Sequence, residues 1–164
     1  MSRALIAKLI LTFVLVGGAI LSFLLDWSPN HLLNPLWHPH ARYHSAILLF
    51  LFAGVAATAT WLLWRRSKEP ATAFTTAALL SLSYWTPFFY VPLLLTPASY
   101  WAGISGHEPR VHGMVLYPNL VVVGLFAFLT ALGWWLGVSC QVRSASIYNE
   151  TKGLKVADEF PRPS

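Results

Sequence analysis

Long apolar blocks alternate with short polar segments along this chain. Four blocks reach membrane length, at about residues 4–25, 43–64, 71–95 and 115–138. A helix needs about 20 consecutive apolar residues to cross the hydrocarbon core of a bilayer. Because no Asp, Glu, Lys or Arg lies at the middle of any block, the pattern predicts an all-α membrane protein, a bundle of four transmembrane helices.

The first block is expected to stay in the protein as a helix. Arg3 and Lys8 would suit the basic start of a signal peptide, but the apolar stretch is longer than the usual core of about 7–15 residues. No small-x-small cleavage site stands out before Asp26. Residues 1–140 are therefore expected to form the four-helix membrane domain, and the polar residues 141–164 a flexible cytoplasmic tail.

Composition supports the membrane class. Hydrophobic residues make up 56% of the chain and charged residues only 10%, with a mean hydropathy of +0.57. A soluble domain carries about 25% charged residues. Most of the surface is therefore expected to face lipid, which makes membrane lipid the first predicted partner.

The basic residues predict the orientation in the membrane. Nine of the eleven Lys and Arg residues lie in the N-terminus, the loop between the second and third spans, or the tail. Short loops rich in Lys and Arg stay in the cytoplasm. Both termini are therefore predicted to be cytoplasmic, and the formal charge of +5 calls for no nucleic-acid partner.

All six histidines fall on the opposite, non-cytoplasmic side, and the densest group is in the first outer loop. His38, His40 and His44 form an H-x-H-x3-H array. Pro39 is expected to lie in the first turn of the second helix, where proline is well tolerated. His40 and His44 would then lie one turn apart on the same helix face, a spacing that can deliver two or three imidazole nitrogens to a metal ion.

The second outer loop adds His107, Glu108 and His112. Their H-E-x-x-x-H spacing is one residue longer than the metalloprotease motif, and Pro109 argues against a helix through it. If the two loops converge, these residues could complete a site with the first array. Imidazole and carboxylate ligands suit iron, zinc or manganese. The candidate metal ligands are His38, His40, His44, His107 and His112.

Three interpretations of these residues stay open. The first is metal binding. The second is metal-free chemistry, in which His40, His44 and Glu108 move protons and Arg42 holds an anionic group or a developing negative charge. The third is structural, since histidines at a membrane interface also cap helices and bond loop carbonyls. Arg42 is also a candidate to pair with Asp26 or Glu108.

The third span contains Pro87 and Pro92 among aromatic residues. Each proline removes a backbone hydrogen bond and bends the helix. A bent, aromatic outer half beneath the histidine loops predicts a pocket for a flat lipophilic molecule, with irregular packing as the alternative. The candidate ligand contacts are all aromatic: Trp37, Tyr43, Tyr84, Trp85, Tyr90 and Trp101.

Small and hydroxyl residues inside the spans predict packing within the bundle. Gly133 and Gly137 form a G-x-x-x-G pattern, expected to bring helices together within one chain more than between chains. Thr75 and Ser81 are expected to hydrogen-bond to neighbouring helices or to their own carbonyls. The absence of charge at mid-span counts against a pump or an ion channel, and the single cysteine, Cys140, excludes a C-x-x-C redox pair.

The first-loop boundary resembles a known pattern. Asn34-Pro35-Leu36-Trp37 followed by Pro39-His40-Ala41-Arg42-Tyr43-His44 is similar to the N-P-x-W-x-P-H-A-[KR]-[FY]-H motif of a poorly characterised family of small four-span membrane proteins. The resemblance covers about a dozen residues and the hydrophobic layout. It implies that His40, Arg42 and His44 share a site, and it supplies no reaction. The layout is also similar to sterol isomerase-like bundles, in architecture only.

Two hypotheses for the function follow. The first is an enzyme acting on a small lipophilic substrate through a histidine-rich site at the non-cytoplasmic face. The second is a non-catalytic membrane subunit, lipid-binding protein or assembly protein. An enzyme should gather its histidines over a pocket, whereas a docking protein should splay them toward solvent. The sequence leaves open the substrate, the reaction and the oligomeric state.

Overall fold

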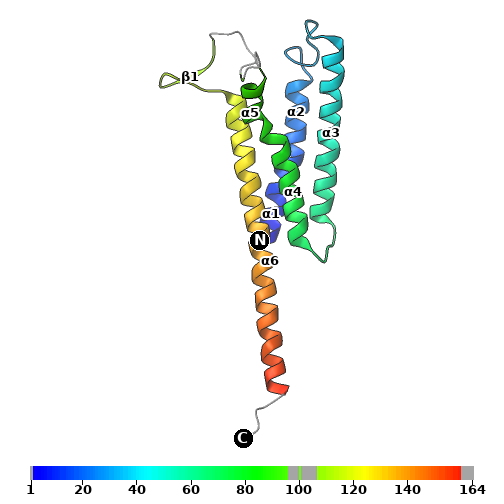
Figure 1. Cartoon of the computed structure of the whole chain (residues 1–164), viewed down its shortest axis with the longest axis vertical. Coiled ribbons are helices and arrows are strands. Elements are labelled where there is room, and N and C mark those ends of the chain that lie inside the picture. Colours follow the sequence, from blue (N-terminus) through cyan, green and yellow to red (C-terminus); the bar gives the residue numbers. More distant parts are fainter. Residues whose placement is uncertain (1, 96–99, 101–106, 160–164) are drawn as a thin grey trace.

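A computed structural model describes residues 2–95, 100 and 107–159, with the backbone alone for 142–159. Within these ranges, four long helices run side by side as one bundle (Figure 1). All four are long and apolar enough to cross a membrane: Arg3–Asp26, Pro39–Trp64, Pro70–Leu94 and Pro118–Gln141. The predicted four-helix, all-α class is therefore confirmed, and the chain is an integral membrane protein.

The first span is assembled from three consecutive helical segments. They are α1 (Arg3–Thr12), the π-helical turn η1 (Phe13–Gly17) and α2 (Gly18–Asp26). Ser2 caps α1 by accepting a hydrogen bond from the backbone N–H of Leu5. A π-turn inside a helix is rare and often marks a functional region. This one lies directly before Gly18, which packs against the Trp85 side chain of the third span.

The second span, α3 (Pro39–Trp64), begins where the sequence predicts. Pro39 occupies its first turn, and His38 caps it, because the His38 Nδ1 accepts a hydrogen bond from the backbone N–H of His40. Residues 27–38, which we call the first connection, link α2 to α3. Their turns are closed by short backbone hydrogen bonds, including His31 N–H to the Ser28 carbonyl at 3.0 Å.

The third span is interrupted as its prolines predict. α4 (Pro70–Trp85) ends before Thr86, and α5 (Pro87–Leu94) begins at the first of the two prolines. The Thr86 hydroxyl donates to the Leu82 carbonyl at 2.8 Å. Pro92 lies inside α5 without ending it.

A small hairpin precedes the last span. β1 (Arg110–Val111) and β2 (Met114–Val115) pair antiparallel. His112 and Gly113 form the turn, with φ of 50° and 82°, and positive φ at both central residues is the preferred geometry of two-residue hairpins. This hairpin was not predicted from the sequence. It extends away from the helices, beyond α6 (Figure 1).

The last helix, α6 (Pro118–Glu159), continues well past the bundle (Figure 1). At about 1.5 Å per residue, its 42 residues span about twice the hydrocarbon core of a bilayer. Between residues 141 and 159 the sequence has one glycine and no proline, so nothing there breaks a helix. The segment expected to be a flexible tail is therefore helical to Glu159, while its flexibility in solution stays a prediction.

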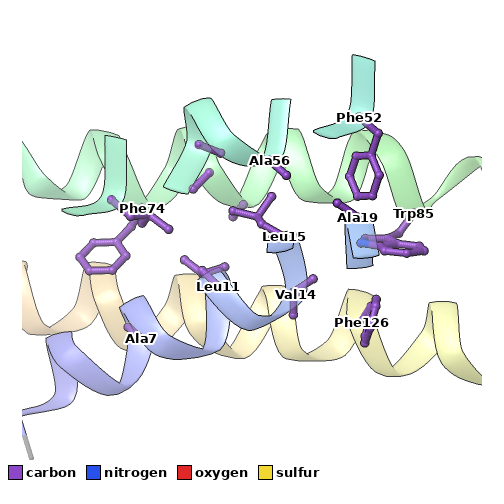
Figure 2. Packing of buried hydrophobic residues seen from close by; sticks show 14 of the residues in the cluster. Ala7, Leu11, Val14, Leu15, Ala19, Phe52, Ala56, Phe74, Trp85 and Phe126 are labelled. Carbon is purple, nitrogen blue, oxygen red and sulfur yellow. The ribbon is translucent and has the colours of Figure 1, made fainter. Parts of the chain in front are cut away.

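The buried core lies where the four spans meet (Figure 2). Two glycines of α6 allow close approaches to other spans. A Cβ added to Gly133 would lie 2.9 Å from Leu11 of α1, and one added to Gly137 would lie 2.5 Å from the Phe74 ring of α4. The G-x-x-x-G pattern thus packs within the bundle, as predicted.

Hydroxyl groups tie the spans together. A buried 2.9 Å hydrogen bond joins Ser81 of α4 to Thr130 of α6. The Trp134 indole of α6 donates to the Thr75 hydroxyl of α4 at 3.1 Å. In membranes such bonds contribute about 0.6 kcal/mol on average. The predicted role of Thr75 and Ser81 in joining helices is confirmed.

Candidate ligand-binding site

Two cavities flank the end of α2. One, which we call the α3 cavity, has a volume of about 490 Å³. The other, the α6 cavity, has a volume of about 510 Å³. Both fall within the range of about 300–1,000 Å³ that is usual for small-molecule sites. The α3 cavity is lined mainly by Leu48, Phe52, Val55, Leu80 and Tyr84, and the α6 cavity by Leu21, Leu25, Trp85, Val122 and Val123.

Three residues line both cavities: Asp26, His31 and Phe88. Asp26 is the last residue of α2, and its backbone carbonyl accepts a hydrogen bond from Leu32 at 2.9 Å. That bond folds the first connection back over the end of the helix. It places His31, the residue before Leu32, at the end of α2, where it lines the same two cavities as Asp26. An acid and an imidazole thus lie at the boundary of two mainly apolar cavities.

Two polar atoms at these cavities have unmet hydrogen-bonding capacity. The Nδ1 of His31 and the Nε1 of Trp85 are both buried without a partner among the described residues. Leaving such a group unpaired costs about 1–3 kcal/mol. Buried unpaired polar atoms are uncommon, and each one needs an explanation such as a bound ligand or an ordered water.

Two neighbouring aromatic residues of α4 serve different cavities. Tyr84 lines the α3 cavity and Trp85 the α6 cavity. The Tyr84 ring lies parallel to that of Phe52, with centroids 3.4 Å apart. Trp85 packs over Gly18, where an added Cβ would lie 2.5 Å from the indole. Figure 2 shows Trp85 between Phe52, Ala19 and Phe126 in the core.

The remaining four predicted ligand contacts have three different outcomes. Trp37 lines the α3 cavity, as expected of a contact residue. Tyr43 and Tyr90 are exposed and line neither cavity. Trp101 lies outside the described residues. Of the six aromatic candidates, Trp37, Tyr84 and Trp85 are therefore the ones that the fold brings to the cavities.

His40 and His44 lie together on the surface. Their Nε2 atoms are 2.9 Å apart, a hydrogen-bonding distance, which confirms that they share a helix face. Both side chains are exposed, and neither lines the two cavities. Their catalytic role stays a prediction that this geometry does not support.

Arg42 holds the first connection to α3. Its Nε donates a 2.7 Å hydrogen bond to the backbone carbonyl of Leu32, and the side chain is half-buried. This bond links the start of α3 to the residue that follows His31. Arg42 thus supports the backbone beside the cavities, while its predicted contact with an anionic group stays untested.

Within the part of the chain that the structure describes, the histidines of the two outer loops do not come together. His107 and His112 are exposed, and Glu108 is half-buried. Figure 1 shows the hairpin beyond α6, on the opposite side of the bundle from the start of α3. Among the described residues, no three His, Cys, Asp or Glu side chains are grouped to hold a metal ion. Metal binding by His38, His40, His44, His107 and His112 stays a prediction without geometric support.

Sequence reasoning missed the two polar residues at the cavities. Asp26 was considered only as a partner for Arg42, and His31 was left out of the metal-ligand array. One signal was present, since Asp26 ends an apolar span at its boundary with the outer loop. The other charges of this span, Arg3 and Lys8, lie at its opposite end, so an acid at the outer end is a functional candidate.

Comparison with known proteins identifies a family without an assigned activity. No curated protein and no solved structure gives a significant match. Residues 10–134 match a family described as a family of unknown function, DUF6640. This match covers the four spans, apart from their outermost residues, and both cavities. The chain therefore belongs to the DUF6640 family.

Proposed function

We propose that this membrane protein binds a small lipophilic molecule between its helices, beside Asp26 and His31. The observation that carries the proposal is that this acid and this imidazole both line two mainly apolar cavities. Asp26 is the last residue of the first span, at its boundary with the outer loop. Apolar pockets with a few convergent polar groups are the usual form of a small-molecule site.

The polar pair is expected to select the ligand. A lipophilic molecule that enters from the bilayer leaves one apolar environment for another, so burial of its hydrocarbon part gains little free energy. A hydrogen bond to a charged group contributes about 1.5–3 kcal/mol. The Asp26 carboxylate and the His31 imidazole, which line both cavities, therefore favour a ligand with a polar group at this height of the bundle.

Acid–base catalysis is the second candidate function. A carboxylate beside an imidazole provides a proton acceptor and a proton donor at one place. In this proposal, Asp26 and His31 carry out the proton transfer that was predicted from the sequence for His40 and His44. Their position on both cavities is the specific observation in favour of a reaction on the bound lipophile.

We also propose that the Asp26 end of the bundle faces away from the cytoplasm. The opposite end carries Arg3, Lys8, Arg65, Arg66 and Lys68. This asymmetry follows the positive-inside rule. Ligand would then enter from the outer leaflet, and both termini would be cytoplasmic.

The test is to identify the lipophilic molecules that co-purify with the protein. Wild type, Asp26→Asn and a control, His40→Ala/His44→Ala, would be purified in the same detergent, and their bound lipophiles extracted and weighed by mass spectrometry. We expect one dominant species in wild type and control, reduced by roughly tenfold or more in Asp26→Asn through loss of the charged acceptor. An unchanged lipid profile in Asp26→Asn would contradict the proposal.

A further inference from the structure

We infer that the ligand is a two-armed neutral lipophile, with a hydroxyl-bearing centre at Asp26 and His31 and one apolar arm in each cavity. This inference rests on the proposed function and specifies its ligand class. It follows from the way the two cavities meet, from what separates them deeper in the bundle, and from the charges on their walls.

The two cavities share only one stretch of wall. Asp26, His31 and Phe88 line both, and every other lining residue belongs to one cavity alone. The α3 cavity takes its separate wall largely from α3, whereas the α6 cavity takes its own from α2 and α6. A ligand that contacts the polar pair therefore has an apolar space on each side of it.

Below the shared wall the cavities are kept apart. Ser22 lies one turn before Asp26 on α2, and its hydroxyl is 3.0 Å from that of Tyr84 on α4. Next to this contact, Trp85 is 3% exposed and lies against Gly18. These contacts close α2 against α4, so two apolar arms can join only at the level of Asp26.

A ligand with one apolar arm would fill only one of the two cavities. The volumes of about 490 Å³ and 510 Å³ are nearly equal, and each alone is large enough for a small molecule. A branched lipophile fills both spaces while placing a single polar group at the shared wall. This arrangement uses the acid, the imidazole and both cavities together.

The charges on the walls favour a neutral hydroxyl centre over a phosphate. No Lys or Arg is found among the described residues that line either cavity, and the Asp26 carboxylate would repel an anion. A hydroxyl group can donate to the carboxylate and still accept a hydrogen bond from an imidazole N–H. A glycerol-type centre with two acyl chains has this chemistry.

The test compares two probes on three forms of the protein. The probes are 1,2-dioctanoylglycerol, with two chains, and 1-monooctanoylglycerol, with one. Binding to the full chain in detergent would be titrated by native mass spectrometry. Val55→Trp fills the α3 cavity and Val122→Trp the α6 cavity, because each residue lines that cavity alone. Val55→Phe and Val122→Phe replace them if a tryptophan variant does not fold.

The expected result is a difference between the probes. Each filled cavity should weaken dioctanoylglycerol binding by about tenfold or more. The single-chain probe should lose only about twofold, because the other cavity still accepts its chain. If one variant weakens both probes equally and the other changes neither, the ligand uses a single cavity, and the two-armed inference is wrong while the proposed function stands. If neither probe binds wild type, the two-armed inference is wrong, and the lipid extraction described above decides the proposed function separately.

Discussion

Ser22 and Tyr84 are joined by a 3.0 Å hydrogen bond between their hydroxyl groups, one helical turn below Asp26. Ser22 is 7% exposed, and the bond connects α2 to α4 at the floor of the two cavities. The Tyr84 ring is also held by the parallel ring of Phe52. The polar end of the cavities thus lies on a floor fixed by contacts from three helices.

This bond is expected to contribute measurably to stability. Tyr84→Phe keeps the ring stack and removes the hydroxyl, and Ser22→Ala removes its partner. We expect a coupling free energy of about 0.6 kcal/mol, the average for such bonds in membranes. The four members of a double-mutant cycle would be compared by reversible unfolding in detergent. Strictly additive single effects would show that the two hydroxyls do not interact.

A methyl group at Gly18 is expected to disturb the α6 cavity. Its Cβ would lie 2.5 Å from the Trp85 ring, so Gly18→Ala must displace the indole at a cost of about 1–3 kcal/mol. Gly124→Ala is the matched control, because nothing lies within 4 Å of its Cβ. Thermal unfolding of both variants in one detergent tests this. Equal stability of the two variants would contradict the close packing of Trp85 on α2.

Loss of the Arg42 side chain is expected to loosen the first connection. Arg42→Gln removes the 2.7 Å hydrogen bond to the Leu32 carbonyl that holds residues after His31 against α3. Amide hydrogen exchange of residues 31–37 should therefore speed up, whereas exchange in the middle of α3 should not change. His44→Gln, which alters an exposed side chain on the same helix, serves as the control. If exchange in Arg42→Gln does not change, Arg42 does not hold the first connection against α3.

The surface histidine pair is expected to matter little for folding or ligand retention. His40 and His44 contact each other in an exposed position, and surface substitutions of this kind usually change stability by no more than about 0.5 kcal/mol. His40→Ala/His44→Ala should unfold at nearly the wild-type temperature and keep its bound lipophile. Loss of a stoichiometric metal ion in this variant, measured by elemental mass spectrometry, would instead restore the metal-site prediction.

The sequence was sufficient for features that depend on local chemistry. Apolar length predicted the four spans, Pro39 predicted the start of α3, and Pro87 predicted the break in the third span. The spacing of His40 and His44 correctly placed them on one face. These features follow from backbone sterics and helix geometry, which neighbouring residues determine.

The sequence was insufficient for features that depend on how the helices are arranged. It placed His40 and His44 on one face without showing that this face points away from the cavities. It left open whether the two outer loops meet, and the hairpin with His112 lies across the bundle from α3 (Figure 1). Asp26 and His31 line both cavities only because of how α2, α4 and α6 pack around them, and the sequence does not show this packing.

The central claim is that a specific lipophile lies beside Asp26, and photocrosslinking tests it most directly. Phe88 lines both cavities, whereas Phe128 is 63% exposed on the outer face of α6. Each would be replaced in turn by p-benzoylphenylalanine, irradiated in membranes, and analysed by intact-protein mass spectrometry. We expect one defined lipophile adduct at position 88, lost when Asp26→Asn is added, and a mixture of bulk lipids at position 128. The same bulk-lipid mixture at both positions would contradict the claim.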